Sequence, residues 1–171
     1  TLYDEVLRVP LAFKLPGAAR GAHSDLAVST EAMVPTVLDV LGLAYDPAQL
    51  SSRSLKPFWS DPEHAEAQPL FSGGTYYFGE KRAVVFDGHK LVLELDTGRK
   101  ELYDLAADPR ELHSLSAAEP ERVHRGVELV KGWVERCAAL RATLGLVGES
   151  SAPIDDEVQD MMRDLGYSGT E

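Results

Sequence analysis

The stretch Lys100-Glu-Leu-Tyr-Asp-Leu-Ala-Ala-Asp-Pro-Arg-Glu-Leu-His-Ser-Leu115 decides the fold of this chain, because it ends a strand and leads into a long helix. Residues 100–105 are predicted to be the third strand of a meander. The two strands before it are residues 82–86 and 89–95, joined by Asp87-Gly88, a strong two-residue hairpin signal. We therefore expect an antiparallel sheet with one face that needs cover.

A helix predicted over residues 119–144 supplies that cover. Its apolar residues recur at spacings of three and four, which is the pattern of a helix with one buried stripe. A meander packed by one long amphipathic helix is a small α+β unit. The stripe consists of Val123, Val127, Val130, Val134 and Cys137.

Upstream of the meander, two further elements are predicted. Residues 11–15 follow Pro10 and alternate apolar with small or charged side chains, as a half-buried strand does. A helix is expected from Thr30, as N-cap, to Leu41, and Gly42 supplies its C-terminal glycine.

The connection between this helix and the meander is predicted to be irregular. Residues 44–68 contain three prolines and many polar residues, and within them only residues 54–58 are expected to pack. Residues 70–74 predict a short strand that ends in a glycine turn.

Composition is that of a globular protein and excludes some partners. The chain has 171 residues, 44% of them hydrophobic, with a net charge of −11, and residues 146–171 form an acidic tail with a short helix expected over 154–166. So much negative charge disfavours nucleic acid, and the sequence contains no apolar run of the roughly 18 residues that span a bilayer. Because Thr1 is not a methionine, we expect the chain to begin inside a longer product, and localisation stays unknown.

Residue chemistry predicts no complete active site. The five histidines have no metal-binding spacing, and Cys137, the single cysteine, lies on the apolar stripe, where packing is expected rather than catalysis. The acids 155–157 lack a calcium-loop pattern, so a helix start explains them better. Asp4-Glu5 likewise predicts a helix or turn start. The histidines are His23, His64, His89, His113 and His124.

Five segments, in order, resemble the C-terminal part of a type I sulfatase of the alkaline phosphatase superfamily. The clearest is the opening stretch, in which Glu-Leu-Tyr-Asp-Leu precedes Asp-Pro-Arg-Glu, with Ser114 where the family usually has Asn. The Thr-Leu-Tyr-Asp-Glu start is similar to the family's Leu-Tyr-Glu-Glu motif. The segments are residues 1–17, 33–43, 53–57, 87–115 and 154–167.

The resemblance implies an α/β fold of the sulfatase type. Residues 1–75 would be the last strands and helix of an incomplete large α/β domain. Residues 76–148 would be a small C-terminal α+β subdomain, an antiparallel sheet packed by a long helix, and residues 149–171 an acidic tail.

The resemblance also implies a sulfuric ester hydrolase in full-length form, inactive as this chain alone. The family uses formylglycine, made from Cys-x-Pro-x-Arg, and Ca²⁺ or another divalent metal. That motif does not occur here, since Cys137-Ala-Ala-Leu-Arg141 lacks the proline. No catalytic or metal residue is therefore assigned, and Thr1 and Tyr3 are placed near the active-site mouth. The implied partners are the N-terminal catalytic part of the same polypeptide and a sulfate ester substrate.

Two alternatives remain open. A phosphonate or phosphate ester hydrolase of the same superfamily would share this architecture. A free-standing, non-catalytic binding or scaffold domain would be an independently stable monomer with no large exposed apolar patch. The sulfatase hypothesis predicts the opposite, namely an orphan strand at 11–15 and an exposed apolar face on the 31–41 helix.

Overall fold

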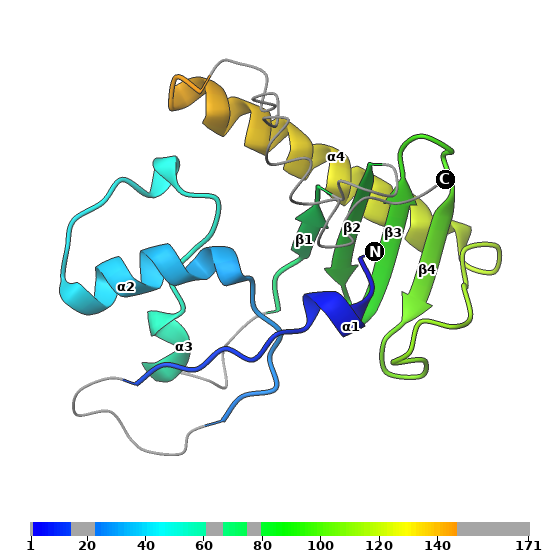
Figure 1. The fold of residues 1–171 in the computed structure, drawn as a ribbon, viewed down its shortest axis with the longest axis horizontal. Coiled ribbons are helices and arrows are strands. Elements are labelled where there is room, and N and C mark those ends of the chain that lie inside the picture. The colour runs from blue at the N-terminus through cyan, green and yellow to red at the C-terminus, as the bar shows by residue number, and fades with distance from the viewer. Residues whose placement is uncertain (1, 15–22, 61–66, 75–79, 147–171) are drawn as a thin grey trace, which may run out of the picture.

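A computed structural model describes residues 2–14, 23–60, 67–74 and 80–146 (Figure 1). Its centre is a four-stranded antiparallel sheet in the order β1-β2-β3-β4. The strands are β1 (Leu70–Gly73), β2 (Lys81–Phe86), β3 (His89–Glu94) and β4 (Lys100–Asp104). Helix α4 (Pro120–Thr143) crosses one face of the sheet, and the short helix α1 (Asp4–Leu7) lies on the other. The predicted meander and its fold class are confirmed.

The hairpin between β2 and β3 has the backbone that its turn sequence demands. Asp87 and Gly88 both take positive φ, 48° and 73°, as a type I′ turn requires. Phe86 therefore pairs with His89, and this register sends alternate residues of both strands to opposite faces.

The face beneath α4 holds the main hydrophobic core. Leu91 and Leu102 are fully buried there, and Val123 and Val130 of α4 pack on them. Trp133 stacks on Phe71 of β1, with ring centroids 5.3 Å apart and planes 4° from parallel. The covering helix was thus predicted correctly.

The apolar stripe predicted on α4 and the strand predicted over residues 89–95 both include residues that the structure leaves exposed. Val134 is 43% exposed, although its neighbours Trp133 and Arg136 lie against the Phe71 ring of β1. Leu95, the last residue of the strand predicted over 89–95, is 49% exposed because β3 ends at Glu94.

The second face of the sheet is also buried, which the sequence analysis did not anticipate. Leu2 packs there on Ala83, Val92 and Tyr103, and Leu7 of α1 lies at the margin of the same cluster. The segment that covers this face thus comes from the far N-terminal end of the chain.

The strand predicted over residues 11–15 is wrong for the described residues 11–14, which are irregular. A strand needs a neighbouring strand to complete its hydrogen bonds, and the described part of the chain offers none beside this segment. Phe13 instead packs on Trp59 of α3 (Lys56–Ser60), with ring centroids 5.3 Å apart.

The upstream helix forms largely as expected. It consists of a 3₁₀ turn (Thr30–Ala32) followed by α2 (Met33–Leu41), and Gly42 ends it with φ 68°. The N-cap prediction was off by one residue, because Ser29 Oγ, not Thr30, accepts from the Glu31 amide. A second 3₁₀ turn (Pro47–Gln49) follows in the irregular connection.

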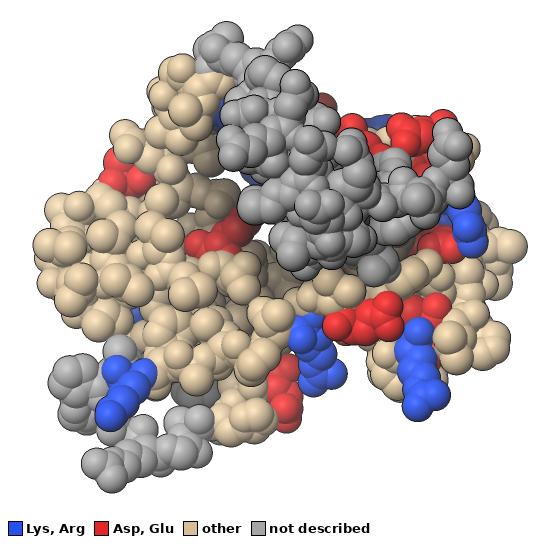
Figure 2. Space-filling model, in the orientation of Figure 1, with Lys and Arg blue, Asp and Glu red and all other residues tan. Residues whose placement is uncertain are grey.

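Of residues 54–58, which were predicted to pack, Ser54 and Leu55 are buried, whereas Lys56 and Pro57 are exposed. The buried Thr36 Oγ1 accepts a 2.8 Å hydrogen bond from the Leu55 amide and donates to Ala32 O. The opposite side of α2 is exposed and apolar, and the part of the surface around α2 in Figure 2 carries few charges. Among the described helices, none combines the length and apolar character needed to cross a bilayer. The helix predicted over 154–166 lies outside the described residues.

Candidate functional site

The most highly organised polar site in the described chain lies on the α1 side of the sheet. Four residues of the sheet and of the loop after β4 contact residues 2–4 there, and we call these four residues the anchor site. They are Lys90, Glu101, Tyr103 and Glu111.

Lys90 is the centre of the anchor site. Its Nζ lies 2.8 Å from Asp4 Oδ1 and 2.9 Å from Glu111 Oε1, and its side chain has no exposed area. Glu111 Oε2 accepts a 2.6 Å hydrogen bond from the Asp4 amide. A lysine is buried in this way only when its charge is paired, and the carboxylates of Asp4 and Glu111 provide the pairing here.

Glu111 reaches Lys90 through an unusual backbone. Its φ is +56°, a left-handed conformation that is uncommon for a residue other than glycine. The Glu111 amide donates to Asp108 O, and Asp108 Oδ2 accepts from the amides of Leu112 and His113, each at 2.8 Å. Asp108 therefore holds the loop in the shape that directs Glu111 inward.

The same loop also closes the free edge of β4. The Leu115 amide donates to Leu102 O at 2.7 Å, and Ser114 Oγ accepts from the Leu102 amide at 3.2 Å. Ser114, which departs from the family pattern, thus still provides an acceptor for the strand edge.

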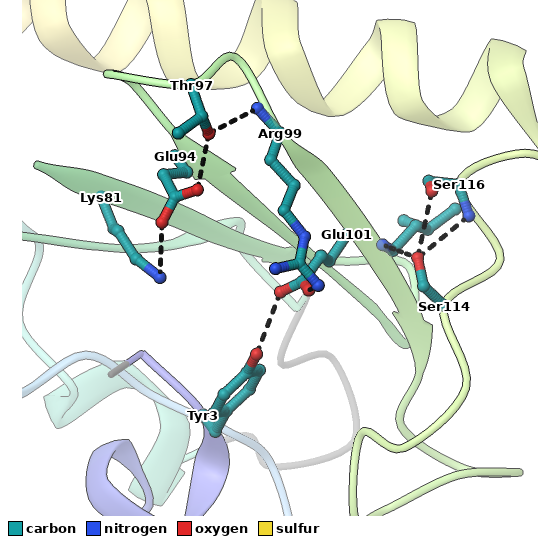
Figure 3. Close-up of polar contacts among 9 residues, drawn as sticks. Tyr3, Lys81, Glu94, Thr97, Arg99, Glu101, Ser114 and Ser116 are labelled. Atoms are coloured by element: carbon teal, nitrogen blue, oxygen red, sulfur yellow. Dashed lines mark hydrogen bonds and ion pairs between the residues drawn. The ribbon is translucent and has the colours of Figure 1, made fainter. Parts of the chain in front are cut away.

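Tyr3 is the second contact between the N-terminal segment and the sheet. Its hydroxyl donates to Glu101 Oε2 at 3.0 Å (Figure 3). Its ring also meets that of Tyr103 edge to face, with ring centroids 6.1 Å apart. Arg99 Nη2 lies 2.6 Å from the other oxygen of Glu101. Figure 3 also shows the neighbouring Lys81–Glu94 ion pair, at 3.0 Å, on the same sheet.

Both phenols are held in the neutral form. Burial, followed by the hydrogen bond to Glu101, raises the pKa of Tyr3. Burial, followed by the Glu101 charge, raises the pKa of Tyr103. A raised phenol pKa makes either tyrosine a poor general base at neutral pH, so the site is chemically suited to holding the segment rather than to proton transfer.

Of the two residues predicted to lie near the active-site mouth, the structure describes only Tyr3. Tyr3 belongs to the anchor site, whereas Thr1 lies outside the described residues. Their placement near an active-site mouth stays a prediction. Asp4 and Glu5 do begin helix α1, as expected.

The remaining candidates are scattered. His23, His89, His113 and His124 lie apart, and the described residues gather no group of three or more histidines, cysteines or acids that could hold a metal. Cys137 is half-buried on α4, and burial raises the pKa of its thiol, which lowers its reactivity. His64 and residues 155–157 lie outside the described part.

Sequence reasoning missed Lys90 and Glu111. The available signal was a lysine directly before the apolar run Leu91-Val-Leu93, at a position that shares a face with Val92. Its partners, Asp4 and Glu111, are 86 positions before it and 21 after it, so the sequence could not show which acids it would meet.

Comparison with known proteins relates this chain to a known family. Residues 1–128 match the family model described as N-sulphoglucosamine sulphohydrolase, C-terminal. An endo-4-O-sulfatase of Bacteroides thetaiotaomicron is 25% identical over 143 residues, which are 71% of this chain and 28% of that protein.

Solved structures show the same fold. One is a complex of a protein with its substrate D-glucosamine-2-N,6-O-disulfate, with a TM-score of 0.53, 20% identity, and coverage of 61% of this chain and 23% of that one. Another is a 2-O GAG sulfatase, with a TM-score of 0.54, 22% identity, and coverage of 61% and 24%. This chain spans about a quarter of the length of these relatives.

Proposed function

Because the chain belongs to the family of the C-terminal part of N-sulphoglucosamine sulphohydrolases, we propose that it is the C-terminal part of a sulfatase that hydrolyses sulfate esters when complete. The observation that carries this proposal is the family match, which spans residues 1–128, from the N-terminal segment to the first turns of α4. This chain then contributes architecture, and the reacting groups belong to the rest of the polypeptide.

The exposed face of α2 supports this proposal. Val34 and Leu41 are 58% and 64% exposed, which is costly for an isolated domain. An upstream α/β part of the same polypeptide, packed on α2, would remove this surface from water. The further apolar residues of this face are Met33, Val37 and Val40.

The division into domains is part of the same proposal. Residues before the sheet would complete the large α/β domain, and the sheet with α4 would be the small subdomain. Since β1 pairs with β2, the boundary fits better before Leu70 than at residue 75.

We infer a sulfated saccharide as the substrate of the complete enzyme. The relatives that match are described as an endo-4-O-sulfatase, a 2-O GAG sulfatase and a protein bound to a glucosamine disulfate. Ca²⁺ and a formylglycine are expected in the complete enzyme. The described residues offer no cluster of metal ligands, so no step of the reaction is assigned to them.

The test is to extend the source gene upstream of Thr1 and to express both the long and the 171-residue products. Sulfate release from sulfated glycosaminoglycan oligosaccharides is expected from the long product and not from the short one. A Cys-x-Pro-x-Arg or Ser-x-Pro-x-Arg motif is expected in the extension. Phosphate or phosphonate monoesters are assayed in parallel, and their hydrolysis without any release of sulfate would favour the phosphoryl-transfer alternative. A reading frame that opens at Thr1 would leave a binding domain.

A further inference from the structure

The N-terminal segment is bound to the sheet in the manner of a peptide ligand. Among the described residues, it adds no strand to the sheet, whose order is β1 to β4 alone. Besides Leu7 at the margin, its contacts come from three consecutive residues of different chemistry. They are the apolar Leu2, the hydroxyl of Tyr3 and the carboxylate and amide of Asp4.

The anchor site is built independently of the segment that fills it. Lys90 belongs to β3, and Glu101 and Tyr103 belong to β4, and both strands are held from the opposite face by the core beneath α4. The backbone of Glu111 is held by Asp108 and its loop, which make their hydrogen bonds without residues 2–4. A site whose backbone is already fixed loses little conformational entropy when its ligand binds.

The charges of the site also remain partnered when the segment is absent. Lys90 would retain Glu111, and Glu101 would retain Arg99. What the empty site lacks is a second acceptor for the Lys90 ammonium group and a donor for Glu111 Oε2. An aspartate with a free backbone amide supplies both.

We propose that the anchor site is a separable recognition site for a Leu-Tyr-Asp segment, and that it binds residues 1–8 of this chain even when they belong to a separate molecule. Leu2 fills the apolar position, which is 5% exposed, and Asp4 supplies the charge that Lys90 requires. Glu5, the neighbouring acid, is exposed and carries no part of the recognition. Two copies of this chain could thus exchange their N-terminal segments.

The test uses the whole chain with a protease recognition sequence inserted after Gly17, so that the segment folds in place before it is cut free. After cleavage, a fluorescent peptide of residues 1–10 is added, and its anisotropy reports exchange into the site. Unlabelled peptides then compete with it. The receptor is the same in every measurement, so a folding defect of a variant cannot be mistaken for lost binding.

The matched pair of competitors is the peptide with Asp4→Asn and the peptide with Glu5→Gln, which remove the same charge one residue apart. The Asp4→Asn peptide is expected to compete roughly 30-fold more weakly or worse, as for a buried charge pair that loses one partner, and the Glu5→Gln peptide like the native one.

Three results would overturn the proposal. They are equal competition by the two peptides, no exchange of the labelled peptide, and loss of the sheet's circular dichroism on cleavage. None of them bears on sulfate ester hydrolysis, so the proposed function stands or fails separately.

Discussion

Gly126 lies where α4 crosses the sheet, at the closest approach of the helix to the core. A Cβ at this position would be 2.6 Å from Leu91 Cδ2 and 3.0 Å from Phe86 Cε1. Leu91 is fully buried and cannot swing away. The glycine is therefore needed for packing, even though alanine suits the interior of a helix better by about 1 kcal/mol.

Gly126→Ala is accordingly expected to destabilise the chain by about 1–3 kcal/mol, as overpacked cores do. Gly132→Ala is the matched control in the same helix, where the nearest atom to a new Cβ is Arg136 Nη1 at 3.4 Å. That variant is expected to be neutral or more stable by up to about 1 kcal/mol. Urea denaturation of both variants checks the prediction, and two changes of the same sign and size would contradict it.

Lys90 is the residue on which the contact between the N-terminal segment and the sheet depends most. Lys90→Met keeps the length of the side chain but leaves the buried Glu111 without its charge partner. We expect a loss of about 3 kcal/mol or more in unfolding free energy, since the remaining charge stays desolvated.

The matched control is Lys131→Met on α4, which removes an exposed lysine paired with Glu128 at 2.7 Å and is expected to cost less than about 0.5 kcal/mol. Chemical denaturation measures both. A Lys90 variant as stable as the control would show that the pair contributes little.

At the scale of elements, the loop from β4 to α4 is ordered by two aspartates. The amide of Ala107, followed by that of Ala106, holds the pKa of Asp104 below its usual value. The amide of His113, followed by that of Leu112, does the same for the pKa of Asp108. The carboxylates of the sequence motif therefore act as hydrogen-bond acceptors for the backbone.

A pH dependence follows from these two shifts. Because each folded-state pKa lies below the unfolded value, the stabilisation is complete above about pH 4 and is lost as the pH falls through the folded-state pKa. Asp108→Asn keeps an acceptor oxygen without a titrating group. Its urea midpoint is expected to fall less than that of the native chain between neutral pH and pH 3. Parallel pH profiles for the two proteins would be the contrary result.

Elements with local signals were predictable, and elements that depend on distant partners were not. The Asp87-Gly88 turn fixed the hairpin because its backbone preference lies within two residues. Residues 11–14 have the alternation of a strand, but alternation cannot supply a neighbouring strand, and the described chain has none there. The short helix α1 was suggested only by its acids, and its place on the sheet was not.

At the scale of the whole molecule, the apolar face of α2 is exposed to water and would be stabilised by burial. We expect the 171-residue chain to self-associate through this face. Val34→Glu combined with Val37→Glu should weaken the association roughly tenfold or more, since two exposed valines, at 58% and 46%, would otherwise become buried.

Val134→Glu is the control, because this valine is similarly exposed, at 43%, but belongs to α4 and not to α2. Sedimentation velocity over a concentration series distinguishes the variants. A native chain that stays monomeric throughout would argue for the free-standing domain instead.

The sequence by itself determined the meander, the helix that covers it and the resemblance to sulfatases, because turn chemistry, apolar periodicity and motif spacing are all local properties. Tertiary structure alone decided that both faces of the sheet are buried and that Lys90 forms ion pairs with both Asp4 and Glu111. It also decided that Gly126 lies where α4 packs most closely on the core. These features depend on contacts between residues 21 to 107 positions apart. The sequence contains several acids that could pair with a buried lysine, and only the folded chain selects two of them.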